Sequence, residues 1–179
     1  MLPKAVRAAM LDGSVYREIS ETPEDMLRAM AVVVSVAIAF GFGLGFRSDL
    51  VESFNNSQVY AILVPASTIL LGWVLWSFVA YIIGSRLLGG SASNRLLLRG
   101  IGIAHGPGIF MALSAFFNDS ANESVIGNAI LTLSLFWMLL AAIVAVRQIQ
   151  GEGWVRAIIP TTIGWFLAEF ILQGVILPL

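Results

Sequence analysis

The stretch VYAILVPASTILLGWVLWSFVAYII, residues 59–83, contains no charged residue and is long enough to cross a membrane as a helix. A helix rises about 1.5 Å per residue, so roughly 20 residues cross a hydrocarbon core of about 30 Å. Further apolar runs cover residues 26–46, 96–117, 125–146 and 157–179. Because lipid offers no hydrogen-bond partner to backbone N–H and C=O groups, each run is expected to be a helix. The runs do not alternate apolar and polar residues, which excludes a transmembrane β-barrel.

The composition agrees with an integral membrane protein. Hydrophobic residues make up 58% of the chain and charged residues 12%, against about 25% charged residues in a soluble domain. We expect an all-α, polytopic protein: a five-helix transmembrane bundle over residues 23–179, with a short amphipathic segment over residues 1–22. The net charge of −1 provides no long-range attraction to nucleic acid. The absence of cysteine excludes disulfides and a cysteine nucleophile.

The basic residues predict the orientation of the bundle. Of the 10 Lys and Arg residues, all except Arg47 fall in or beside the N-terminal segment, the second connection or the fourth connection. These regions lie on one side of the membrane if every run spans it. Lys and Arg are enriched in cytoplasmic loops, so the sequence predicts a cytoplasmic N-terminus and a C-terminus on the opposite side.

The N-terminal segment is expected to lie on the inner leaflet as two short amphipathic pieces. Apolar residues recur in it at helical spacing: Leu2, Val6, Met10 and Leu11. Asp12-Gly13 should interrupt this pattern. Ser14 is expected to cap a second short helix that contains Val15, Tyr16 and Ile19.

The first span has a defined start and a glycine-rich face. Thr22-Pro23-Glu24-Asp25 predicts its N-terminus, because Thr can cap a helix, Pro suits the first helical position and acids complement the helix dipole. Gly41 and Gly45 lie one turn apart and allow another helix backbone to approach closely. Packing within the chain is the favoured interpretation, and a contact between two copies is the alternative. Gly102 and Gly106 are further candidates for close helix contact.

Three arginines surround the second connection, GSRLLGGSASN at residues 84–94. They are Arg86, Arg95 and Arg99, and they are predicted to contact headgroups of the inner leaflet. Gly89-Gly90 permits a tight turn, but the stretch lacks the Lys-Ser/Thr ending of a phosphate-binding loop. A docking surface for phosphate or for a protein is the alternative.

Two ionisable residues lie deep within the predicted spans. At about 1.5 Å per residue, His105 lies about 14 Å and Glu169 about 18 Å from the inner surface. Pro107 lacks a backbone N–H and should kink the third span. One stripe of the last span carries polar side chains that should face other helices: Thr162, Trp165, Glu169 and Gln173. The predicted buried polar cluster is His105, Glu169, Gln173 and Thr162, with His105 as the first candidate partner of Glu169.

Three roles are open for Glu169. The favoured one is a hydrogen-bonded group that fixes packing; the others are part of a proton or ion path and a contact with a partner subunit. One His and one deep carboxylate are too few ligands for a metal site. The chain has no deep aspartate pair, no Ser–His pair in a helical context and no H-E-x-x-H motif. No catalytic, metal-binding or cofactor-binding residue is therefore predicted, and the chain is not expected to be an enzyme.

Short motifs occur in a particular order along nearly the whole chain. They are Tyr16-Arg17-Glu18-Ile19 with Pro23, Tyr81-Ile82-Ile83-Gly84, Leu88-Gly89-Gly90, Arg99-Gly100 with His105-Gly106-Pro107, Trp137, Ala145-Val146-Arg147-Gln148, Arg156-Ala157 and Gly164-Trp165. In this order the chain resembles the Yip-domain family (Ypt-interacting proteins), in its prokaryotic form. The resemblance implies a five-helix membrane protein with its N-terminus in the cytosol.

The resemblance also bears on function. Eukaryotic members bind small Rab-type GTPases, act in vesicle traffic or membrane shaping, and carry a longer cytosolic N-terminal region. Because only residues 1–22 precede the first span here, small-GTPase binding is not carried over. For prokaryotic members the family implies no established activity.

The expected function is that of a non-enzymatic scaffold or adaptor, as an accessory subunit of a larger complex in a prokaryotic plasma membrane. Its expected partners are the lipid bilayer and other membrane protein subunits or a second copy. The alternative is a small transporter or proton-coupled channel that uses His105 and Glu169.

Overall fold

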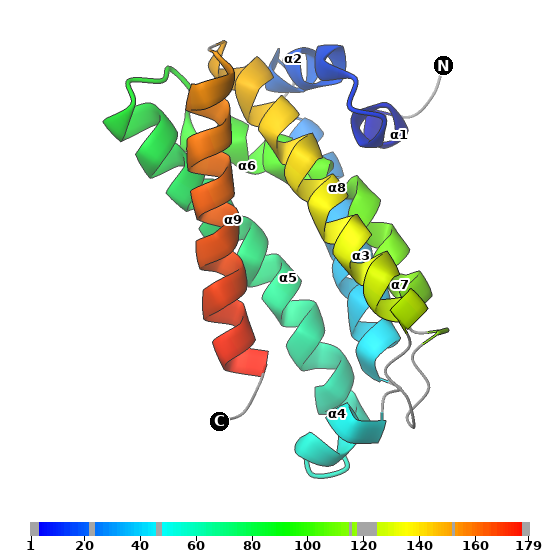
Figure 1. Cartoon of the computed structure of the whole chain (residues 1–179). Coiled ribbons are helices and arrows are strands. Elements are labelled where there is room, and N and C mark those ends of the chain that lie inside the picture. Colours follow the sequence, from blue (N-terminus) through cyan, green and yellow to red (C-terminus); the bar gives the residue numbers. More distant parts are fainter. Residues whose placement is uncertain are drawn as a thin grey trace.

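Figure 1 shows the chain as a helical bundle, in a computed structural model that describes residues 4–21, 24–45, 48–114, 116–117, 125–151 and 153–176. In these ranges, five helical segments are long and apolar enough to cross a membrane. The all-α, five-span fold class predicted from the sequence is confirmed.

Each predicted run corresponds to one spanning segment. The first span is α3 (Asp25–Gly45), and the second is α5 (Gln58–Tyr81) continued by the π-helix η1 (Ile82–Leu87). The third consists of α6 (Asn94–Ala104), the 3₁₀ helix η2 (Gly106–Phe110) and α7 (Met111–Ser114). The fourth and fifth are α8 (Val125–Gln150) and α9 (Trp154–Ile176). Shorter helices are α1 (Lys4–Ala9), α2 (Gly13–Glu21) and α4 (Ser48–Ser53).

The bundle has two distinct ends (Figure 1). One end, here called the α2 end, holds α2 and the connections that precede α6 and α9. At the other, the α4 end, lie α4 and the C-terminal end of α9. Helix α1 and the C-terminal end of α9 thus lie towards opposite ends, as an odd number of spans requires. Which end faces the cytoplasm stays a prediction.

The third span forms the centre of the core near the α2 end. Its helix α6 packs against α3, α5 and α8, and Leu97 and Ile101 on it are fully buried. A Cβ atom on Gly102 would lie 2.9 Å from the Cβ of Ala29 on α3, so the glycine allows close approach of these two helices. On α3, Gly41 and Gly45 likewise face Ile62 of α5. Packing within the chain accounts for all three glycines, whereas Gly106 is half-buried at the start of η2.

The third span is interrupted at the position where a kink was predicted. α6 ends at Ala104, and η2, which contains Pro107, follows His105. Proline cannot donate the next helical hydrogen bond, so the backbone leaves the α-helical pattern at this point. The imidazole Nδ1 of His105 lies 2.7 Å from the carbonyl oxygen of Ile101, one turn earlier.

The N-terminal segment packs against the bundle. Val15, Tyr16 and Ile19 of α2 are fully buried, and α2 contacts α6 and α8. The indole N–H of Trp137 on α8 donates to the carbonyl oxygen of Ala9 at 2.7 Å, which fixes the end of α1. Contact of this segment with the inner leaflet stays a prediction; the expectations for Leu2 and for the Thr22-Pro23 helix start lie outside the described residues.

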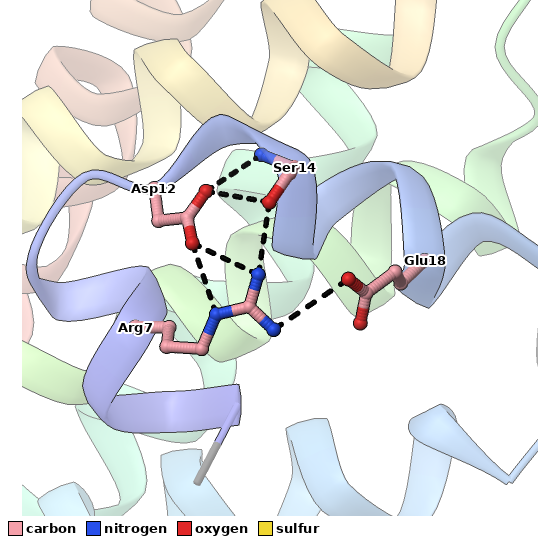
Figure 2. Close-up of polar contacts among 4 residues, drawn as sticks. All are labelled: Arg7, Asp12, Ser14 and Glu18. Carbon is pink, nitrogen blue, oxygen red and sulfur yellow. Dashed lines mark hydrogen bonds and ion pairs between the residues drawn. The ribbon is translucent and has the colours of Figure 1, made fainter. Parts of the chain in front are cut away.

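A polar network joins α1 to α2, as Figure 2 shows. The Nε of Arg7 donates to Asp12 Oδ2 at 2.9 Å, and its Nη2 donates to the Ser14 hydroxyl at 2.9 Å. The backbone N–H and hydroxyl of Ser14 both donate to Asp12 Oδ1, at 3.0 and 2.6 Å. The expectation that Ser14 caps the second helix is therefore wrong. Because α2 begins at Gly13, Ser14 already lies in the first turn and Asp12 accepts the capping hydrogen bond.

The same contacts shift the pKa values of two charged groups. Hydrogen bonds from Ser14 and then from Arg7 lower the pKa of the Asp12 carboxyl below its ordinary value. The hydrogen bond to Asp12 raises the pKa of the Arg7 guanidinium, which also lies 3.5 Å from a Glu18 carboxylate oxygen. These groups are therefore charged over the physiological pH range and hold the turn between α1 and α2.

Candidate functional site

A small cavity lies between α5, α8, α9 and the break in the third span. Its lining consists of Thr68, Ile69, Gly72, Trp73, Trp76, His105, Leu135, Met138, Trp165, Ala168 and Glu169. Its volume of ≈ 20 Å³ is close to the smallest space that can hold one water molecule. The two deep ionisable residues singled out in the sequence thus line one cavity.

The orientation of the His105 ring is fixed by a backbone hydrogen bond. A carbonyl oxygen can only accept, so Nδ1 must carry the proton that it shares with Ile101. In the neutral imidazole, Nε2 is then an acceptor. The residue is only 3% exposed, and its ring lies 5.6 Å from the Trp76 ring. Among the hydrogen bonds of the described residues, none joins His105 directly to Glu169, so their pairing stays a proposal.

The α9 side of the cavity carries a donor and a carboxyl group. The Nε1 atom of Trp165 is buried and has no hydrogen-bond partner among the described residues. Glu169, one turn further along α9, is half-buried and lines the cavity. On α5, the Thr68 hydroxyl donates to the carbonyl of Pro65 at 2.6 Å, so its oxygen can still accept. Donor and acceptor groups therefore meet at one place within the apolar bundle.

The remaining members of the predicted cluster lie elsewhere or are not described. Thr162 is half-buried and is not part of the cavity lining, and the side chain of Gln173 lies outside the described residues. Thr161, the residue before Thr162, is fully buried instead, and its hydroxyl donates to the carbonyl oxygen of Ala157 at 2.6 Å. Thr161 was not included in the predicted cluster. Adjacent threonines lie about 100° apart around a helix, and the sequence alone does not fix which of the two faces the bundle interior.

Two tryptophans of α5 were also missed as site residues. The indole N–H of Trp73 donates to the carbonyl of Leu98 on α6 at 2.8 Å, and that of Trp76 donates to Thr161 on α9 at 2.8 Å. Their i,i+3 spacing within an uncharged run places both on one face of the helix. Indole N–H groups need a partner in an apolar interior, so this spacing was the available signal.

The predicted headgroup arginines differ in exposure. Arg86 and Arg95 are exposed, and the Nε of Arg86 donates to the Tyr81 hydroxyl at 3.0 Å. Arg99 is half-buried, and its Nε has no partner among the described residues. Nearby, Gln150 at the end of α8 is 3% exposed and packs directly on Gly84 of η1. No local pattern marks Gln150 in the sequence, because it follows an apolar run like any residue at a helix end.

The described residues include no group of three or more His, Asp or Glu side chains placed to hold a metal ion.

The fold and the cavity define a polytopic helical membrane protein whose deep polar groups lie inside the bundle. The family model of the Yip1 domain matches residues 11–176, and the chain belongs to this family. The resemblance seen in the sequence is thereby confirmed at the level of the family, while the prokaryotic form stays a prediction. Comparisons with curated proteins and with solved structures gave no match.

Proposed function

We propose that the chain is a non-enzymatic membrane scaffold or adaptor and serves as an accessory subunit of a larger membrane complex. Membership of the Yip1 domain family supports a membrane role. The observation that carries the proposal is the size of the deep cavity. At ≈ 20 Å³ it has room for about one water molecule, which favours a packing role for its polar groups over the passage of a solute.

The outer surface of the bundle supports association with lipid and protein. Phe136 on α8 and Phe166 and Phe170 on α9 are 54%, 60% and 79% exposed. In a membrane such side chains face lipid or another helix, and aromatic rings provide large contact areas at protein interfaces. We therefore propose other membrane protein subunits, or a second copy, as partners beside the bilayer.

We further propose a prokaryotic plasma membrane as the location, with the α2 end in the cytoplasm. Arg86 lies near the end of η1, Arg95 at the start of α6 and Arg147 near the end of α8. Figure 1 shows these ends of the three helices at the α2 end. An excess of basic residues on one side is typical of cytoplasmic loops. Near anionic lipid, the exposed Arg86 and Arg95 would contact headgroups.

Native mass spectrometry of the full chain after mild extraction from its own membrane tests the proposal. We expect a stable complex heavier than the 19.3 kDa chain. Replacing Phe166 and Phe170 by Ala should dissociate it if α9 contributes the contact, whereas Phe78→Ala on α5 is the matched exposed aromatic control. A chain that is monomeric and supports proton-dependent flux in liposomes, with flux abolished by Glu169→Gln, would establish the transport alternative instead.

A further inference from the structure

The deep cavity contains unused hydrogen-bonding capacity on two sides. On the α9 side, the Trp165 indole N–H is buried without a partner among the described residues. On the side of the broken third span, His105 is only 3% exposed, and its Nδ1 is already hydrogen-bonded to the carbonyl oxygen of Ile101. Its Nε2 remains as an acceptor. An unpaired buried donor is unfavourable because it has lost its hydrogen bond to water, so this arrangement favours a molecule that satisfies both groups.

We propose that the cavity binds one ordered water molecule, which accepts a hydrogen bond from Trp165 and donates hydrogen bonds to His105 Nε2 and the Glu169 carboxyl group. The volume of ≈ 20 Å³ exceeds the roughly 10–15 Å³ that one water requires. Buried waters typically make about three hydrogen bonds, which is the number of partners assigned here.

The water takes the place of the direct contact between His105 and Glu169 expected from the sequence. His105 belongs to the break in the third span and Glu169 to α9. Among the residues that line the cavity, these two side chains alone titrate, because the others from α5, α8 and α9 are apolar, hydroxyl-bearing or indole groups. The water therefore links the position of α9 to the broken span through both ionisable groups. This inference does not depend on the proposed scaffold role.

Nuclear magnetic resonance of the full chain, with ¹⁵N-labelled tryptophan indoles in lipid nanodiscs, tests the proposal. We expect the Trp165 indole N–H to show cross-relaxation with a bound water. The Trp73 and Trp76 indoles should show none, because each donates to a backbone carbonyl. Trp154, half exposed at the start of α9, provides the reference for exchange with bulk water. Trp165→Phe assigns the signal and removes it while keeping an aromatic ring.

Two variants separate a bound water from a direct contact. Glu169→Gln retains an acceptor, so the water signal at Trp165 should persist with a shifted indole resonance. Glu169→Leu removes the carboxyl group, and the signal should be lost or strongly weakened. If wild-type Trp165 shows no water signal, the cavity is dry and the proposal is wrong. If Trp165 shifts in Glu169→Gln but never contacts water, the indole bonds the carboxyl group directly and the proposal is equally wrong.

Discussion

At the scale of single residues, small side chains decide how closely the spans approach. A Cβ atom on Gly41 of α3 would lie 2.6 Å from the backbone oxygen of Ile62 on α5. A backbone oxygen cannot rotate away as a side chain can, so the two helices depend on this glycine. Within a membrane, where lipid is as apolar as the helix surfaces, such close packing is a main source of association.

Gly41→Ala should lower the free energy of unfolding by about 1–3 kcal/mol, because it forces extra volume into a closed contact. Reversible unfolding of the full chain in mixed micelles measures this change. The matched control is Gly174→Ala on α9, where a new Cβ meets nothing within 4 Å. That substitution should be neutral or stabilising by up to about 1 kcal/mol, because alanine favours a helix more than glycine does. Equal effects at both positions would contradict close α3–α5 packing.

The turn between α1 and α2 should respond to acid through Asp12. Its pKa is lowered in the folded chain, so its contribution to stability is present above the ordinary aspartate pKa and is lost as the pH falls through the lowered value. A spin label at the exposed residue Met10 should keep constant mobility down to about pH 3.9 and become more mobile below it.

Asp12→Asn tests whether the aspartate is responsible. Asparagine caps helices as well as aspartate does but cannot form an ion pair with Arg7. The label in this variant should be more mobile at neutral pH and should change little on acidification. Glu52→Gln, at an exposed site on α4, is the control and should behave like the wild type. An unaltered acid transition in Asp12→Asn would assign the effect to another carboxyl group.

At the scale of elements, indole N–H groups connect different helices, and two of the three bonds join residues far apart in the sequence. Trp76 links α5 to α9, Trp73 links α5 to α6, and Trp137 links α8 to α1. Each bond is directed at a backbone carbonyl, which retains a second lone pair after helical bonding. These contacts fix which helices are neighbours in a way that apolar packing alone does not.

Trp76→Phe should lower the free energy of unfolding by about 1 kcal/mol, the scale of interhelical hydrogen bonds in membranes. Its aromatic ring remains, so the loss reports mainly the bond to Thr161. The same unfolding assay provides the measurement. Tyr60→Phe removes a polar group from the exposed surface of the same helix and should have little effect. A stability loss of the same size in both variants would show that the indole bond is not the cause.

The sequence predicts some of these elements better than others. The five spans follow from apolar length, and the break at Pro107 follows from a missing backbone N–H. The π-helix η1 could not be predicted, because its residues also suit an α-helix. Helix α4 was missed within a polar connection.

For the cavity, depth along the spans placed His105 and Glu169 at one level. The direction in which each side chain points around its helix axis depends on tertiary contacts, so it could not be predicted from the sequence.

At the scale of the whole molecule, the five spans place the connections alternately at the two ends of the bundle. The connection between α8 and α9 lies at the α2 end, whereas the C-terminal end of α9 lies at the α4 end (Figure 1). All Lys and Arg residues of the chain except Arg47 fall in segments that the sequence assigns to the cytoplasmic side. Fold and charge together therefore predict a single topology with the N-terminus inside.

Reporter fusions test this topology directly. A reporter inserted after Arg147 should score as cytoplasmic, and one fused after Leu179 should score as external, because α9 crosses the membrane between them. A third reporter after Asn56, beyond α4, should also score as external. If the reporters after Arg147 and Leu179 score on the same side, α9 does not span and the five-span topology is wrong. If each of the three reporters scores on the side opposite to the expected one, the five-span fold is retained but the orientation derived from the basic residues is wrong.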